Sequence, residues 1–262
     1  FLIRFGGPVD ADRLEKAFAA VVAKSDVLRT RILTAADKPL DITTQPPMES
    51  ERRHVAYDDF ARWAAKQACR TLDLSIAPYE SVIADHPDGM LSWYLNLHHL
   101  VNDGQSAELV LRAVEAEYAG SPIPIGRFYS IDRVASHASS EKEAARKYWQ
   151  DRRKLPRIDR LYGNLQRSLA DAGQQAVLRK TDIDELLEQG LSGDYRLVTT
   201  GISRVAFWIF ATALHINRLS GSDRFSVGLI VNHRERLAAT DVVGPMLELF
   251  PVDIEIQEHD TH

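Results

Sequence analysis

The sequence predicts an α/β fold of two lobes, in each of which helices pack on a mixed sheet. In both halves of the chain, segments with the two-residue period of strands alternate with segments that have the three- to four-residue period of helices. Residues 91–99 and 107–118 are the clearest example of such a pair. With 262 residues, of which 45% are hydrophobic and 26% charged, the chain is long enough to bury a large core.

The first half contains six predicted elements. They are a strand at residues 1–5, a helix at 10–24, a helical segment at 60–69, a strand at 91–99, a helix at 107–118 and a helix at 141–154. Asp10 precedes the first helical pattern and is predicted to cap it, because a carboxylate there accepts hydrogen bonds from free N–H groups. Cys69 is interpreted as a small core residue.

The second half continues the alternation. Its predicted elements are strands at residues 174–180, 224–231 and 247–256 and helices at 182–189 and 203–219. The helix at 203–219 is apolar on nearly every side, which predicts that a core surrounds it. Residues 155–173 keep no period, so we place the boundary there and assign residues 1–160 to the first lobe and 161–262 to the second.

Composition argues against several classes of protein. The formal net charge of -5, without a long basic stripe, argues against a nucleic-acid-binding protein. The longest apolar stretch, residues 205–211, is too short for a membrane span, and the first residues lack the pattern of a signal peptide. Because Cys69 is the single cysteine, no intrachain disulfide is possible, which favours a reducing compartment and predicts a cytoplasmic location.

Residues 91–120 carry the only pattern that suggests chemistry. Leucines and Trp93 alternate with polar residues, which is typical of a strand with one apolar face. By this alternation His99 shares the apolar face and is predicted to point inward, whereas His98 lies on the polar face. An imidazole titrates near neutral pH, so His99 could take a proton from an attacking amine or hydroxyl.

A turn and a helix follow the two histidines. Val101 to Gly104 has the composition of a turn, and Gly120 is predicted to end the helix. Asp103 stands where its carboxylate could cap the helix. The free N–H groups at the start of a helix favour developing negative charge, so the N–H of Gly104 could face the oxyanion of a tetrahedral intermediate.

Other candidate groups have simpler interpretations. Ser106 lacks the G-x-S-x-G elbow of a nucleophilic serine and is predicted to cap the helix. Trp93, Trp149 and Trp208 are predicted core residues. The sequence contains neither an HExxH motif nor a cysteine–histidine array, and no glycine-rich phosphate-binding loop, so no metal or nucleotide site is predicted.

The string His98-His99-x-x-x-Asp103-Gly104 is an HHxxxDG signature, and further segments match the same family in the expected order. They are Leu28-Arg29-Thr30, Tyr148-Trp149, and Ser226-Val227-Gly228 through Arg234 to Val243-Gly244. Together these segments resemble the condensation domains of nonribosomal peptide synthetases, which implies two chloramphenicol acetyltransferase-like lobes. The match is imperfect at Lys24-Ser25-Asp26, where the family has Arg-His-Glu, and at Glu248, where it usually has Asn.

The resemblance also implies roles for individual residues. The position of His99 is the one implicated in catalysis, either as general base or as the group that orients the nucleophile and stabilises the charged intermediate. His98 would frame the motif. Asp103 would pair with Arg29 and serve the architecture, since an arginine partner lowers the pKa of a carboxylate and makes it a poor base. By its own segment Arg234 is a solvated arginine, whereas the resemblance places it near a tunnel between the lobes.

The implied activity is acyl transfer between carrier proteins. An acyl or aminoacyl thioester on the phosphopantetheine arm of a donor carrier would be attacked by an amine on an acceptor carrier, giving an amide. The chain itself would bind no cofactor. Two alternatives remain open at this point: a free-standing acyltransferase that esterifies a hydroxyl, and a non-catalytic relative that docks a carrier. An epimerisation domain, which shares the motif, is a further alternative.

Compared with the family, the chain is expected to be partial. It lacks the segment that would precede the strand at residues 1–5, and it ends soon after Pro251, where a condensation domain would continue. The second lobe is therefore expected to be incomplete, without part of the wall opposite the motif.

Overall fold

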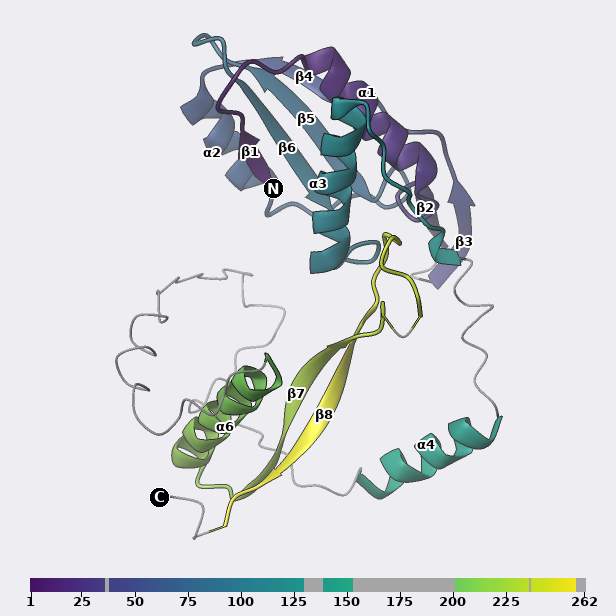
Figure 1. Cartoon of the computed structure of the whole chain (residues 1–262), viewed down its shortest axis with the longest axis vertical. Coiled ribbons are helices and arrows are strands. Elements are labelled where there is room, and N and C mark those ends of the chain that lie inside the picture. Colours follow the sequence, from purple (N-terminus) through teal and green to yellow (C-terminus); the bar gives the residue numbers. More distant parts are fainter. Residues whose placement is uncertain (36–37, 130–138, 153–200, 236, 258–262) are drawn as a thin grey trace. The chain divides into compact units, whose positions relative to one another are not determined.

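The computed structural model of the chain describes residues 1–35, 38–129, 139–152, 201–235 and 237–257 (Figure 1). Contacts divide the chain into two units. The first is formed by Phe1–Ala138 together with Val231–Glu248, and the second by Ser139–Ile230 together with Leu249–His262. The predicted boundary at residues 160 and 161 lies outside the described residues and stays a prediction. That prediction did not include the return of Val231–Glu248 to the first unit.

The first unit is built on a mixed sheet of four strands. Their order is β1 (Leu2–Arg4), β6 (Leu91–Leu97), β5 (Tyr79–Asp85) and β4 (Glu51–His54). The pairs β1–β6 and β5–β6 are antiparallel, whereas β4 and β5 are parallel. A separate antiparallel hairpin consists of β2 (Thr30–Ala35) and β3 (Lys38–Thr44).

Helices cover both faces of this sheet. On one face lie α1 (Ala11–Lys24) and α3 (Gly104–Ala119) (Figure 1). They pack against the side chains of Trp93 and Leu95. On the other face α2 (Tyr57–Gln67) packs through Phe60 against Val82 and Tyr94. The predicted cap of the first helix is confirmed, because the Asp10 carboxylate accepts hydrogen bonds from the backbone N–H groups of Asp12 and Arg13.

The covering of both faces corrects the predicted polar face of β6. Ser92 and Tyr94 are as buried as the apolar residues between them, with 0% and 3% of their surface exposed. The Ser92 hydroxyl hydrogen-bonds Nε2 of buried His86, and the other ring nitrogen of His86 lies 2.7 Å from the carbonyl oxygen of Val55. The alternation of polar and apolar residues therefore separates two buried faces of β6, and on the second face the Ser92 hydroxyl has the partner that a buried polar group needs.

Tyr94 gives this face a pH dependence. Burial raises the pKa of its phenol to about 12 from an ordinary value of 10. Between these values the unfolded chain ionises Tyr94 and the folded chain does not, so the free energy of unfolding falls as the pH rises. Two pKa units correspond to roughly 2–3 kcal/mol. We expect this part of the alkaline loss of stability to disappear in Tyr94→Phe, measured by urea denaturation at a series of pH values. A variant that loses stability as steeply as the parent would contradict this.

Cys69 is exposed, which corrects its predicted place in the core. The helix α2 ends at Gln67, two residues before the cysteine. The Cys69 thiol therefore lies beyond the face that Phe60 and Ala64 bury against the sheet.

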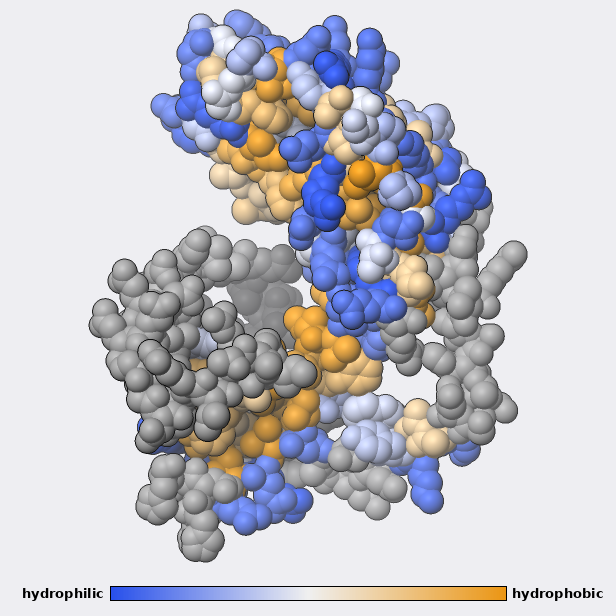
Figure 2. Space-filling view, in the orientation of Figure 1, coloured by the Kyte–Doolittle hydropathy of each residue, from blue (hydrophilic) through white to orange (hydrophobic). Residues whose placement is uncertain are grey.

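The second unit contains α4 (Ser139–Arg152), α6 (Gly201–Ser220) and most of the strand pair β7 (Arg224–Asn232) and β8 (Leu247–Glu255). The predicted helix at residues 203–219 is confirmed as a helix, but not as a buried one. Among its described residues only Ala213 is fully buried, and Trp208 is 44% exposed. Figure 2 shows apolar colour over α6 and the strand pair. The predicted strand at 174–180 and helix at 182–189 lie outside the described residues.

In the described parts of the chain, no helix combines the length and apolar character that crossing a membrane requires.

Candidate functional site

The HHxxxDG segment begins in a turn that follows β6. The strand ends at Leu97, and a backbone hydrogen bond of 3.1 Å from the Val101 N–H to the His98 carbonyl closes the turn. The His98 ring supports it, because its Nδ1 accepts the Leu100 N–H at 3.1 Å. A ring nitrogen that accepts carries no proton, so a neutral His98 holds its proton on Nε2. This contact gives His98 a structural part in the turn.

His99 is exposed, not inward-facing as the alternation predicted. The strand period ends two residues earlier, so the side chain at position 99 follows the geometry of the turn and not that of the sheet. Buried Val101, with 2% of its surface exposed, anchors the far end of the turn in the core. The imidazole of His99 is thus accessible on a backbone that is fixed on both sides.

Asp103 is the best-satisfied group of the motif. Its carboxylate is 2% exposed and accepts the Ser106 N–H at 2.8 Å, so it caps α3 as predicted. It also accepts the Met246 N–H at 2.9 Å and two hydrogen bonds from Arg234, at 2.9 and 3.3 Å. The pairing with Arg29 is therefore wrong: the partner is Arg234, which lies 131 positions along the chain.

Arg234 is equally buried, with 3% of its surface exposed, which corrects its solvated interpretation. Its expected place near a tunnel between the lobes stays a prediction. Its Nη2 also donates to the Ser106 hydroxyl at 2.6 Å and to the Gly244 carbonyl at 2.7 Å. Burial lowers the pKa of Arg234, and the charge of Asp103 opposes that shift. Arginine keeps its charge under such conditions, so the pair is a buried ion pair, and Nη2 has further acceptors in Ser106 and Gly244.

Ser106 completes this network and was missed by the sequence interpretation. Its side chain does not cap the helix. The hydroxyl donates to the Gly244 carbonyl at 2.8 Å and accepts the Gly244 N–H at 2.9 Å. The network thus joins the start of α3 to the segment Val231–Glu248 at several points. The serine that follows Asp103 by three residues was the available signal, but its partners lie far away in the sequence.

Residues near Arg29 in the sequence, but not Arg29 itself, hold a different segment of the chain. The side chain of Arg29 makes no ion pair among the described residues, and its Nε is buried without a hydrogen-bond partner. Asp26 instead accepts the backbone N–H groups of Phe128 and Tyr129 at 2.9 and 3.1 Å. The Thr30 hydroxyl shares a hydrogen bond of 2.8 Å with that of Tyr129. The segment that departs from the family at Lys24-Ser25-Asp26 therefore anchors residues 128–129.

Gly244 lies close to the Phe128 side chain of this anchored segment. Its φ is 155°, and a Cβ built there would lie 2.0 Å from Cδ2 of Phe128. We expect Gly244→Ala to reduce the free energy of unfolding by about 1–3 kcal/mol, because the ring or the backbone must move. Urea denaturation measures this. Gly104→Ala is the matched control, since a Cβ there meets no atom within 4 Å; equal losses in the two variants would contradict the steric cause.

Gly104 begins α3, directly after the residue that caps it. Open space around its Cα leaves the first turn of the helix approachable. Its N–H belongs to the helix start, where negative charge is favoured. The described residues contain no group of three or more histidine, cysteine, aspartate or glutamate side chains suited to a metal ion.

The comparisons with known proteins agree on one family. The family described as Condensation domain matches residues 1–262. Enterobactin synthase component F of Shigella flexneri is 26% identical over 285 residues, covering 99% of this chain and 21% of the relative. A dimodular nonribosomal peptide synthase of Bacillus subtilis is 23% identical over 283 residues, covering 97% of this chain and 11% of the relative. The chain thus spans about a fifth or less of these relatives.

Solved structures support the predicted fold. A structure that describes condensation domain-mediated chain release from the enacyloxin polyketide synthase matches with a TM-score of 0.75 at 19% identity. The match covers 99% of this chain and 53% of that one. The predicted α/β architecture and the resemblance drawn from the HHxxxDG segments are confirmed.

Proposed function

The chain belongs to the condensation-domain family, and from this premise we propose that it is an acyltransferase that forms amide bonds in nonribosomal peptide synthesis. The observation that carries the proposal is the motif turn: an exposed His99 follows a buried strand and precedes a buried, fully paired Asp103. A module that only docks a partner needs an accessible surface. It does not need an exposed imidazole on a turn that a buried ion pair anchors.

We propose the following chemistry at His99. The amine nitrogen of the acceptor attacks the thioester carbonyl carbon, so a C–N bond forms and the carbonyl oxygen becomes an oxyanion. The imidazole accepts the proton that the nitrogen loses. When the C–S bond breaks, the carbonyl re-forms and the sulfur leaves as a thiol with a proton returned from the imidazolium. The Gly104 N–H, at the start of α3, would stabilise the oxyanion.

The substrates would reach His99 on partner proteins. Donor and acceptor carrier proteins, or adjacent carrier domains of a synthetase, would each present a phosphopantetheine arm. Tethering raises the effective concentration of each substrate and orients it, so the chain itself needs little binding energy for the reacting groups. No cofactor would belong to the chain. We place the reaction in the cytoplasm, because a single cysteine favours a reducing compartment.

The alternative is transfer to a hydroxyl, which would give an ester by the same steps. The departures from the condensation pattern at Lys24-Ser25-Asp26 and at Glu248 leave room for it. The motif residues would act alike on either acceptor, since His99 can take a proton from nitrogen or oxygen.

One experiment separates these activities. The full-length protein is incubated with a carrier protein that bears an acyl thioester and with a panel of amine and alcohol acceptors, and the products are identified by mass spectrometry. Amide formation above the rate without protein supports the proposal, and ester formation alone supports the alternative. If neither the thioester nor the acceptor is consumed in any combination of substrates, the result would argue for a docking role.

A further inference from the structure

A pocket of the first unit, formed by residues outside the motif, is lined by more carboxylates than cations. It has a volume of about 330 Å³ and lies between the segment before β4, the segment after α2 and the start of β5. The residues that matter here are Met48, Glu49, Arg70, Leu72, Ile76 and Glu80. None of the HHxxxDG residues lines it.

Glu80 is the group in this pocket that lacks a partner. Its side chain is half-buried, and among the described residues it makes neither a hydrogen bond nor an ion pair. Burial and the charge of Glu51 raise the pKa of Glu80, and the charges of Arg70 and Arg53 oppose this shift. The Arg70 guanidinium instead donates to the Gln67 side chain at 2.9 Å. A carboxylate withdrawn from water without a direct ion pair is unfavourable, and a cation bound against it would relieve this cost.

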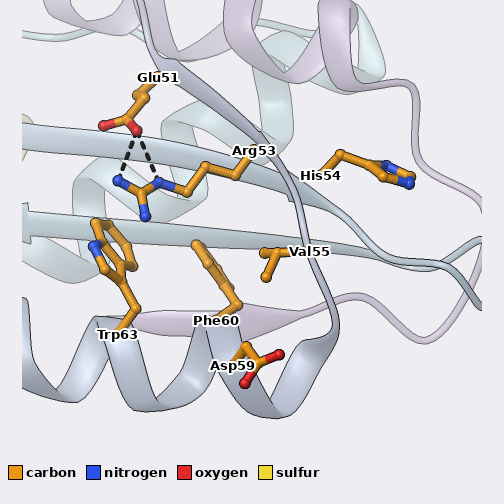
Figure 3. Close-up of a pocket in the computed structure, with 7 residues that line it drawn as sticks. All are labelled: Glu51, Arg53, His54, Val55, Asp59, Phe60 and Trp63. Carbon is orange, nitrogen blue, oxygen red and sulfur yellow. Dashed lines mark hydrogen bonds and ion pairs between the residues drawn. The ribbon is translucent and has the colours of Figure 1, made fainter.

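A second pocket, which shares Glu51 with the first, serves as a contrast. There Arg53 donates to Glu51 at 2.8 Å and its guanidinium lies 4.0 Å from the centre of the Trp63 ring (Figure 3). The charges of Arg53 and Glu51 are therefore satisfied within the protein. Glu51 also lines the pocket of Glu80, so its charge is already compensated there.

The remaining charges and the apolar rim define the ligand. Glu49 and Glu80 add negative charge to the Glu80 pocket, and the carboxylate of Asp73 is held by hydrogen bonds from Ser75. Met48 and Ile76 are 39% and 52% exposed at its edge. A half-buried carboxylate and exposed apolar side chains in one pocket suit a long alkyl chain that ends in a cation, because such a chain buries its stem and pairs its head.

We propose that this pocket binds a basic side chain, lysine or arginine, presented by a partner polypeptide, with Glu80 as its counter-charge. The volume suits a single side chain better than a cofactor. The exposed Met48 and Ile76 offer apolar surface beyond the cavity, which a polypeptide covers and a free amine does not. The net charge of -5 also favours a basic partner. This proposal is independent of amide formation at His99.

The test uses nuclear magnetic resonance on the full chain. The probes are a capped Leu-Lys-Leu tripeptide, the same peptide acetylated on the lysine, and spermidine. We expect the basic peptide to shift the amide signals of residues around Glu80 and the acetylated peptide to leave them unchanged. Glu80→Gln should weaken the basic peptide about tenfold, since a charge-assisted hydrogen bond is lost. Met48→Ser should weaken the binding of the basic peptide and leave the affinity for spermidine unchanged.

Matched controls make the result decisive. Glu51→Gln changes the carboxylate that Arg53 already compensates, so it should alter peptide affinity less than Glu80→Gln. Equal thermal midpoints of the variants show that each is folded. The proposed site would be wrong if Glu80→Gln left the affinity for the basic peptide unchanged, or if the acetylated peptide bound as tightly as the basic one. Spermidine that binds as tightly as the peptide would overturn the assignment to a polypeptide.

Discussion

Replacement of Arg234 by methionine is expected to lower the free energy of unfolding by about 3–5 kcal/mol, because it leaves the Asp103 carboxylate buried without its cation. Asp103 is 2% exposed, so water cannot replace the guanidinium without local opening. The Ser106 hydroxyl and the Gly244 carbonyl lose a charged donor in the same step. Urea denaturation of the full chain measures the change.

Two further variants identify the partner of Asp103. Arg29→Met should cost less than about 1 kcal/mol, because it removes a buried Nε that no acceptor satisfies. The double variant Asp103→Asn with Arg234→Met should be more stable than Arg234→Met alone, since asparagine keeps an acceptor for the helix cap and carries no charge. A loss from Arg29→Met as large as that from Arg234→Met would contradict the observed pairing.

The sequence predicted those features that depend on neighbours along the chain. Asp10 caps α1 through residues two and three positions later, and Gly120 ends α3 with a φ of 79° that glycine adopts readily. The strands at 91–97 and 224–232 were likewise visible, because a two-residue period is a local property. The same holds for the motif itself, whose residues lie within seven positions.

Features that depend on distant neighbours could not be predicted in this way. Both faces of β6 are buried because α2 covers one of them, which no pattern within residues 91–99 records. Charge alone does not say which arginine meets Asp103: Arg29 and Arg234 are chemically equivalent candidates, and only the return of Val231–Glu248 to the first unit decides between them. The orientation of His99 depends on where the strand ends, and a single residue shift reverses the side that an alternation assigns.

The largest expected effect on activity is that of His99→Ala. If the imidazole takes the proton of the attacking amine, its removal should reduce amide formation by about 10²–10⁴-fold, the usual contribution of a positioned acid–base group. His99 is exposed and makes no ion pair among the described residues, so the free energy of unfolding should change little. The measurement is the rate of product formation from an acyl-loaded carrier at saturating amine.

Comparison with His99→Gln distinguishes the two roles left open for this residue. Glutamine can hydrogen-bond the nucleophile but cannot take its proton. A general base therefore predicts that glutamine is as inactive as alanine, whereas an orienting role predicts substantial recovery. His54→Ala removes another exposed histidine of the first unit, one that lines the pocket of Figure 3, and should leave the rate unchanged. Amide formation by His99→Ala at the rate of the parent would remove His99 from the mechanism, and the activity would then depend on other groups of the fold.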